Sequence, residues 1–214
     1  MKRALMLRTV ALWAGHVHAE EPRACVGATL TSNYLLDALT QTDDRPAFQR
    51  YLEVEFSPGF YVGAWLSNVD FGDGTDSIET DLYVGLRGET ALFSYDFTLF
   101  RYYYDETGYC CGEFVAELEF PIYGAVSGTT AYYSYLNGTY AVSAGLGVSL
   151  PGDFELSGIY KTDRVDETWN VGVSRYLSET VWADVRYHDA SYADGTAVVS
   201  LNWDARWNDI FGGR

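Results

Sequence analysis

Acidic side chains recur at every second position in several stretches of this sequence. Glu79 is followed by Asp81, and Glu117 by Glu119, with one residue between the members of each pair. In an extended strand successive side chains point to opposite faces, so the two acids of a pair would share one face. Carboxylates gathered in rings around an aqueous passage attract cations. The chemistry that this spacing offers is therefore electrostatic.

Residues that could support covalent catalysis are few. After residue 19 the only histidine is His188, which lies beside Asp189 and close to Ser191. A nucleophile needs a base within hydrogen-bond reach and a third group that orients the base. Three residues crowded into one loop give no such geometry, and the sequence contains no nucleophile elbow. We predict that the protein is not an enzyme and has no catalytic residues, and we keep a hydrolase as the least favoured alternative.

Metal and cofactor sites are not predicted either. The acidic stretch 70–76 lacks the distal glutamate and the spacing of an EF-hand, so it is interpreted as a turn. Three cysteines are too few for a disulfide framework. Cys110 and Cys111 are adjacent, and they are either two loop thiols or a vicinal disulfide, whereas Cys25 stands alone. No functional role is assigned to any of the three cysteines.

The elements that must position the acids are β-strands. Between residues 140 and 150 the even positions are apolar and the odd positions are small or polar, and this period of two recurs about twelve times along the chain. No helical period competes with it after residue 19. The predicted strands are 25–36, 46–57, 59–70, 78–87, 92–104, 113–120, 124–135, 139–150, 153–162, 168–177, 181–188 and 197–204.

The connections between these strands alternate in length. Tight turns are predicted at 57–59, 87–92, 121–123, 151–152 and 178–179, and longer polar loops at 37–45, 70–77, 105–112, 163–167 and 189–194, with 136–138 as a short member of the second set. Short periplasmic turns and longer extracellular loops are typical of outer-membrane barrels, whereas a soluble sandwich would not sort its loops in this way. We predict an all-β fold: a transmembrane antiparallel up-and-down β-barrel of about 12 strands, each with about 9–11 residues in the membrane. Both termini are then periplasmic, and Cys25 and Cys110 fall at opposite ends of the barrel.

Aromatic residues support this interpretation. They form 16% of the chain, and runs such as Tyr102–Tyr104 and Tyr132–Tyr133 lie toward predicted strand ends. Tyrosine and tryptophan favour the membrane–water interface because one end of the side chain is apolar and the other is polar. The alternative is a tyrosine-rich sandwich core. The aliphatic character of the remaining apolar faces favours two aromatic girdles.

The beginning of the chain is organised as an export signal. Lys2 and Arg3 precede a mostly apolar stretch at 4–15, and Val17 and Ala19 fit the positions before a cleavage site. The alternative is a buried N-terminal helix. We predict a signal peptide at 1–19, cleaved near Ala19, and a single outer-membrane β-barrel domain at 20–214.

Charge limits the partners. The formal net charge is −16, and a nucleic-acid-binding protein needs a basic face, so nucleic acid is excluded. The expected partners are outer-membrane lipid and small ions or solutes. The sequence leaves the oligomeric state open.

Three stretches resemble a known family. Leu30-Thr31-Ser32-Asn33-Tyr34-Leu35, the residues 40–47 and the run from Gly59 to Gly74 are similar to the opening of the TorF-type porins of proteobacteria, also called the Gcw family. The resemblance is dense over 26–105 and diffuse afterwards. It implies a signal peptide, an outer-membrane β-barrel and a suspected pore, and it carries no catalytic motif. The chain departs from the family at 36–39, where members have an aromatic-Arg-Gly sequence, and at its end, where members finish on an aromatic residue.

If the apolar positions of each strand face lipid, the alternate positions, which carry the acidic side chains, face the lumen, because burying a carboxylate in hydrocarbon costs free energy. The predicted pore-lining residues are Glu53, Glu55, Glu79, Asp81, Arg87, Asp96, Glu113, Glu117, Glu119, Glu155, Lys161, Asp184 and Arg186. We predict a narrow porin-like channel with an acidic, cation-favouring lumen for passive passage of ions or small solutes. The alternative is a plugged, non-conducting structural or adhesin-type barrel. The spacing names no solute.

Overall fold

The chain folds almost entirely into β-strands. The structure is a computed structural model that describes residues 21–56 and 58–207, so the predicted signal peptide at 1–19 lies outside the described residues. The strands are β1 (Arg23–Thr31), β2 (Leu35–Leu36), β3 (Leu39–Thr40), β4 (Ala47–Phe56), β5 (Phe60–Asn68), β6 (Ile78–Glu89), β7 (Ser94–Tyr104), β8 (Gly108–Tyr123), β9 (Val126–Tyr135), β10 (Tyr140–Leu150), β11 (Phe154–Thr162), β12 (Glu167–Tyr176), β13 (Val181–Ala190) and β14 (Ala193–Arg206). Among the described residues, no helix has the length and apolar character needed to cross a membrane.

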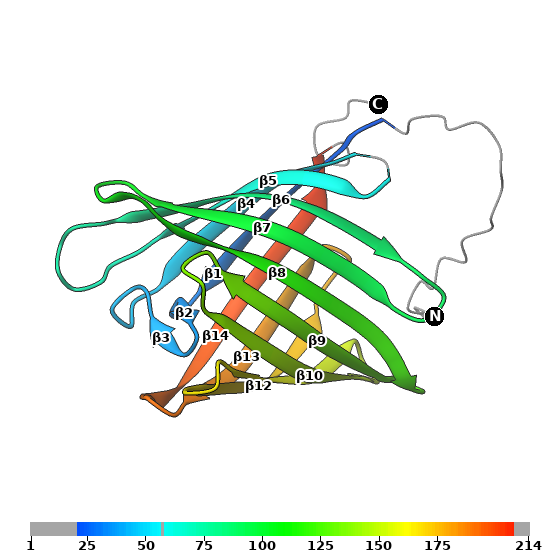
Figure 1. The fold of residues 1–214 in the computed structure, drawn as a ribbon. Helices are drawn as coiled ribbons and strands as arrows, with labels where there is room; N and C mark the ends of the chain where they lie inside the picture. Colours follow the sequence, from blue (N-terminus) through cyan, green and yellow to red (C-terminus); the bar gives the residue numbers. More distant parts are fainter. Residues whose placement is uncertain (1–20, 57, 208–214) are drawn as a thin grey trace.

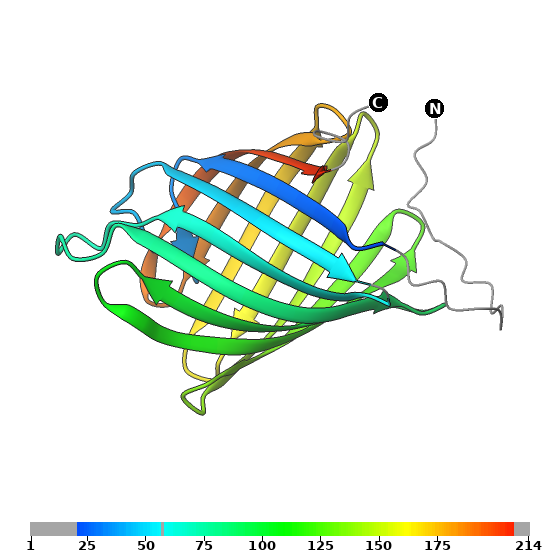
Figure 2. The same ribbon diagram turned by 90° about the horizontal axis from the view of Figure 1, so that it is seen from above.

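Twelve of these strands, β1 and β4 to β14, close into one antiparallel barrel (Figure 1). Each pairs with its neighbours in sequence order, and β1 closes the ring by pairing with both β4 and β14. The strands are tilted relative to the barrel axis (Figure 2). The short strands β2 and β3 form a separate two-stranded sheet at one end. The predicted up-and-down barrel of about 12 strands is confirmed.

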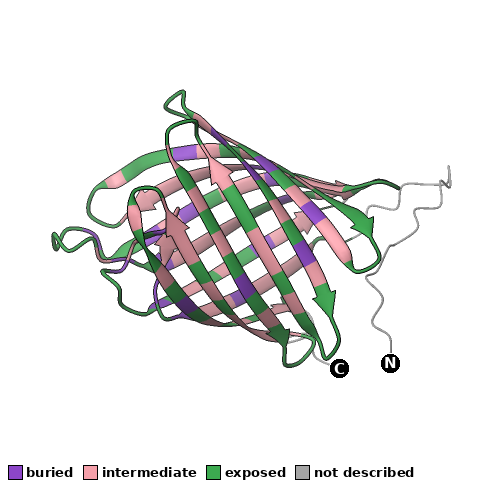
Figure 3. Ribbon diagram, turned by 90° about the horizontal axis from the view of Figure 1, so that it is seen from below, coloured by how far each residue is buried: buried purple, intermediate pink, exposed green. Residues whose placement is uncertain are grey.

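The two faces of the barrel wall have opposite character. Along the strands, buried and exposed positions alternate (Figure 3). Leu146 is 58% exposed and Leu201 is 49% exposed, whereas Glu53 is only 7% and Glu79 only 3% exposed. A soluble protein does the reverse, burying leucine and exposing carboxylates. The outer face is therefore suited to hydrocarbon, and the polar backbone groups are satisfied within the closed sheet.

Glycines on the inner face accommodate tyrosine rings from the neighbouring strand. Gly63 lies opposite Tyr83, and Gly85 lies opposite Tyr61. A Cβ atom at Gly63 would lie 2.2 Å from the Cζ atom of Tyr83, and one at Gly85 would lie 2.2 Å from that of Tyr61. Each ring therefore covers the backbone of its glycine and lies against the wall, where the absence of a side chain leaves room for it.

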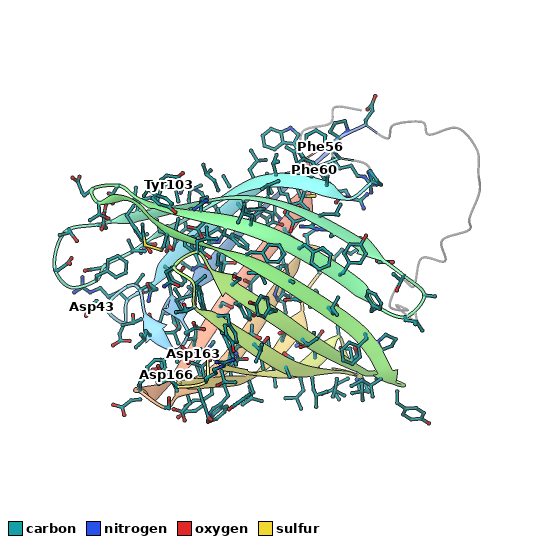
Figure 4. The ribbon with its side chains drawn as sticks, viewed as in Figure 1. Asp43, Phe56, Phe60, Tyr103, Asp163 and Asp166 are labelled. Atoms are coloured by element: carbon teal, nitrogen blue, oxygen red, sulfur yellow. A yellow bond between two sulfur atoms is a disulfide. The ribbon has the colours of Figure 1, made fainter. Side chains whose placement is uncertain are left out.

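The two ends of the barrel differ in their connections. Turns 58–59, 90–93, 124–125, 151–153 and 177–180 lie at one end, and connections 32–46, 69–77, 105–107, 136–139, 163–166 and 191–192 lie at the other. Phe56 and Phe60 mark the first end in Figure 4, and Asp43, Asp163 and Asp166 mark the second. The two longest connections are at the second end, as predicted.

Several predicted boundaries were wrong. The loop predicted at 105–112 is reduced to 105–107, because β8 begins at Gly108 and pairs with the end of β7. The loop predicted at 189–194 is likewise reduced to 191–192. The tight turn predicted at 121–123 is part of β8, where a register shift beyond Pro121 accommodates a residue that cannot donate a ladder hydrogen bond. The strand predicted at 25–36 ends at Thr31.

Candidate pore lining

The cross-strand register puts the thirteen residues proposed from the sequence as pore-lining on one face of the barrel wall, and nine of them border interior cavities. The cross-strand register brings several of them side by side, since Arg87 lies opposite Asp96, and Asp96 lies opposite Glu117. Other residues on the inner face of the barrel are absent from the predicted pore-lining set. Tyr61, Trp65 and Tyr83 line the same cavity as these charged residues.

Each of the three predicted inner cations is already engaged by a carboxylate. The guanidinium of Arg87 donates to the two carboxylate oxygens of Glu53 at 2.8 and 3.1 Å, and its Nε lies 3.2 Å from Asp96. The Nζ atom of Lys161 lies 2.7 Å from Asp37. These ion pairs neutralise most of the positive charge of the two side chains, so they would repel a passing cation only weakly.

Arg186 is held in the same manner on the opposite side of the barrel. Its Nη2 atom lies 3.2 Å from the Oδ2 atom of Asp184. It also donates to Asn170 at 2.6 Å and to Ser157 at 2.9 Å. The guanidinium is thus fixed against the wall formed by β11, β12 and β13.

The remaining predicted acids are less compensated. Tyr104 donates to Glu79 at 3.1 Å, and Tyr102 donates to Glu113. The Oε2 atom of Glu79 and the Oδ1 atom of Asp81 are buried and have no hydrogen-bond partner among the described residues. Within the described part of the chain, no lysine or arginine forms an ion pair with Glu79, Asp81, Glu113, Glu117, Glu119 or Glu155.

The interior contains cavities in series. A cavity of about 610 Å³ is lined by Asp81, Glu53 and several aromatic rings, and one of about 540 Å³ is lined by Glu55 and Glu119 near the turn end. Arg87, Asp96 and Glu117 line both cavities, so this charged group stands between them. The Arg87 guanidinium also lies 3.8 Å from the centroid of the Tyr61 ring.

The segment 32–46, which contains β2 and β3, folds into the end of the barrel that carries the longer connections. Tyr34 contacts the inward ring of Trp65 edge-on at 5.5 Å between centroids. Asp37 reaches Lys161 on β11, and its carbonyl accepts a hydrogen bond from Tyr192 at 2.7 Å. The segment therefore crosses the mouth from β5 to β11. Burial and the charge of Glu79 raise the pKa of the Tyr34 hydroxyl, so it stays protonated and able to donate.

The inward segment is held together by its own polar contacts. Thr42 is fully buried and donates to the carbonyl of Arg45 at 2.6 Å. Asn33 donates to Asp44 at 2.8 Å and accepts from Thr40 at 2.8 Å. An extracellular loop is predicted here from the sequence, and Asp37 is not among the predicted pore-lining residues. Asp37 has a φ of 48°, and Ala38, Asp43 and Asp44 also have positive φ, a conformation that no local sequence pattern predicted.

Two neighbouring loops exchange aspartate contacts at the same end. Asp76 accepts hydrogen bonds from the backbone of Glu106 and Thr107, and Asp105 accepts from the backbone of Ser77 and Ile78. The hydrogen bonds from Ser77 and Ile78 hold the pKa of Asp105 down at about 2. The exchange joins the connections 69–77 and 105–107 into one unit.

The remaining candidates for chemistry are dispersed. Cys110 and Cys111 form a vicinal disulfide on β8, next to a register shift, and Cys25 is a free thiol on β1. Ser191 accepts a hydrogen bond from the backbone of Glu167, and none is found between Ser191 and His188 in the described residues. The same residues contain no group of three His, Cys, Asp or Glu side chains placed to hold a metal ion.

Comparison with known proteins agrees with this architecture. A family model described as "Bacterial protein of unknown function (Gcw_chp)" matches residues 19–147, which confirms the resemblance found in the sequence. A search of curated proteins finds no match.

Solved structures of a porin and of an outer membrane protein share the fold. The barrel is similar to the KdgM porin, with a TM-score of 0.64 and 11% identity over 84% of this chain and 98% of that chain. It is also similar to a KdgM porin in complex with disordered oligogalacturonate, with a TM-score of 0.60 and 10% identity over 85% and 98% of the two chains. The outer membrane protein Omp33 of Acinetobacter baumannii gives a TM-score of 0.52 and 11% identity over 86% and 98%. At these identities the similarity establishes the fold alone.

Proposed function

The chain belongs to the Gcw_chp family of bacterial proteins, and from that membership and its closed outer-membrane barrel we propose that it is a narrow channel that favours cations. The observation that carries the proposal is the imbalance of charge on the inner face. Arg87, Lys161 and Arg186 are each neutralised by a carboxylate. Acids such as Asp81 and Glu117 have no basic partner among the described residues, and they would lower the energy of a cation in the lumen.

The charge distribution also argues against one class of solute. One of the similar porins is described in complex with oligogalacturonate, a chain of sugars that each carry a carboxylate. The carboxylates that line the present barrel would repel such a polyanion. We therefore propose cations and small solutes without negative charge as the permeating species.

Size restricts the solute further. Barrels with eight strands are filled by side chains and those with sixteen hold a wide aqueous channel, so twelve strands give an intermediate width. The segment 32–46 occupies part of the mouth and narrows it further. The proposal is therefore limited to ions and small molecules.

We also propose that the protein is exported, that it forms a single domain and that it has no catalytic activity. Removal of residues 1–19 would leave one outer-membrane barrel at 20–214. A catalytic serine would need His188 as its base, and the hydrogen bond from Glu167 to Ser191 offers no support for that role. The second candidate is a non-conducting structural or adhesin-type barrel, favoured by the segment that crosses the mouth.

The test is single-channel recording of refolded mature protein in a planar bilayer under a KCl gradient. We expect a stable conductance and a reversal potential that indicates preference for K⁺. Replacing Glu79, Asp81 and Glu117 by their amides should reduce that preference, whereas Asp163→Asn on an exposed loop should not. A folded barrel without conductance would overturn the proposal in favour of the structural candidate. Conductance with no preference for K⁺ would overturn the role of the acids.

A further inference from the structure

Aromatic rings form one wall of the larger inner cavity. Tyr51, Tyr61, Trp65, Tyr83 and Phe100 extend into it from the consecutive strands β4 to β7. Tyr61 and Tyr83 are 6.0 Å apart between ring centroids, and Tyr83 and Phe100 are 5.6 Å apart. At about 610 Å³ the cavity has the size of a small-molecule site rather than that of a single bare ion.

The inward glycines determine how these rings lie. Tyr51 covers Gly27 and Tyr83 covers Gly63, because a Cβ atom on either glycine would lie 2.2 Å from the ring. One face of each ring therefore packs on the backbone of the neighbouring strand. Both rings also line the cavity, where the negative π surface of an aromatic ring can attract a cation.

The cavity also contains a carboxylate oxygen without a hydrogen-bond donor among the described residues. Asp81 is 8% exposed and lines the cavity, and its buried Oδ1 atom accepts no hydrogen bond from this part of the chain. An ionised group buried in this way is costly unless a cation or a donor compensates it. The one described cation of the cavity wall, Arg87, is already committed to Glu53 and Asp96.

Arg87 itself shows how this wall holds an organic cation. Its guanidinium lies 3.8 Å from the centroid of the Tyr61 ring and between two carboxylates. The same cavity offers the same two elements, aromatic rings and the Asp81 carboxylate, and Arg87 is the one cation among the described residues that line it.

We propose that the cavity between Asp81 and the aromatic wall of β4 to β7 binds small organic ammonium ions. The apolar substituents of such an ion would contact the rings while its charge faces Asp81. A hydrated metal ion would gain little from the rings, and the described residues provide no set of three ligands for one. This inference rests on the proposed function, because it names the class of solute that the channel would select.

Calorimetry on the refolded barrel in detergent tests binding without requiring conduction. The probe is choline, and the matched control is 3,3-dimethylbutan-1-ol, which has nearly the same shape and no charge. We expect choline to bind and the alcohol not to bind. Equal heats for the two probes, or no heat for choline with a folded barrel, would overturn the inference while leaving the channel function untouched.

Two variants locate the site. Asp81→Asn and Trp65→Leu should each weaken choline binding about tenfold or more, since each removes one of the two recognition elements. Asp163→Asn, on an exposed loop, should bind choline as the parent does. Heat-modifiable mobility on gels verifies that each variant is folded. Unchanged affinity in folded Asp81→Asn would contradict the assignment. If choline binds while the bilayer shows no conductance, the proposed channel fails and the binding site remains.

Discussion

Lys161 and Asp37 meet across 124 positions of sequence, with the lysine Nζ 2.7 and 2.8 Å from the two carboxylate oxygens. The same ammonium group lies 4.3 Å from the centroid of the Tyr133 ring. Lys161 belongs to the barrel wall and Asp37 to the segment that crosses the mouth. This ion pair therefore attaches the inward segment to the wall opposite Trp65.

Breaking this attachment should widen the channel. In the double variant Asp37→Asn with Lys161→Met the pair of opposite charges is removed together, so the net charge of the lumen is unchanged. We expect a larger single-channel conductance with the same preference for K⁺, because the segment 32–46 loses its hold on β11. The control is Arg164→Met, which removes a cation at the same end that contacts only the Tyr140 ring in the described contacts. An unchanged conductance would mean that the pair does not restrict the entrance.

The glycine and tyrosine pairs should behave as single units. Gly63→Ala places a Cβ atom against the Tyr83 ring and should destabilise the barrel by about 1–3 kcal/mol, as overpacking does. Tyr83→Leu alone removes the ring, and adding it to Gly63→Ala should recover part of that loss. A double-mutant cycle from urea unfolding in lipid vesicles measures the coupling. Additive effects of the two changes would contradict the close approach.

Arg87 should stabilise the barrel through its carboxylates. Arg87→Met leaves Glu53 and Asp96 without their cation and should cost about 1–3 kcal/mol, toward the lower end because the arginine side chain is 38% exposed to the lumen. Arg175→Met is the matched control, since Arg175 lies over the Phe154 ring and has no ion pair within the described residues. The free energy of unfolding is measured with urea. Equal decreases in the two variants would show that the ion pairs of Arg87 with its carboxylates contribute nothing to stability.

The aspartate exchange between two loops predicts a specific dependence on pH. The pKa of Asp105 is lowered to about 2 by its hydrogen bonds, below its ordinary value near 4 in an unfolded chain. Its contribution to loop stability is therefore complete above pH 4 and is lost as the pH falls through about 2. Limited proteolysis of the connection 69–77 should be unchanged between pH 7 and pH 4.5 and should increase in Asp105→Ala at both.

The matched control for this loop is Asp73→Ala. Asp73 lies in the same connection, and among the described residues its side chain accepts hydrogen bonds only from Thr75 within its own turn. We expect this variant to keep the proteolytic resistance of the parent chain, because the exchange between Asp76 and Asp105 is intact. Equal sensitivity in the Asp73 and Asp105 variants would show that the loops are not joined by the exchange.

The barrel could be predicted from the sequence because the signal for it is local. Between Ile78 and Arg87, mostly apolar side chains alternate with mostly polar ones. This pattern identifies a strand and its inward face before any neighbouring strand is known, since successive side chains in a strand point to opposite faces. The same argument places Glu79 and Asp81 inward. Strand ends were less accurate. β8 begins at Gly108 because Tyr103 and Tyr104 on β7 are available to pair with it, which is a property of the partner strand.

The inward segment could not be predicted for a related reason. Asp37 becomes a site residue only because Lys161, far along the chain, lies within reach once the ring has closed. Nothing in the residues 32–46 encodes that distance. Trp65 and Tyr83 were missed for a simpler reason: the pore-lining residues were selected from charged side chains alone, so aromatic side chains on the same face were left out.

The seam between β1 and β14 determines the order in which this molecule can be completed. Cys25 on β1 pairs with Glu53 on β4 and with Arg206 on β14. The second pairing cannot form until β14, the last strand in the sequence, is in place. Pairing β1 with β14 closes a loop that contains all the other strands, and this is slow compared with forming the hairpins between consecutive strands. Throughout that interval the growing sheet has two bare edges, which are the sites where unrelated chains attach to one another. The time from the first strand to the last is therefore the period in which the nascent protein is most vulnerable to aggregation.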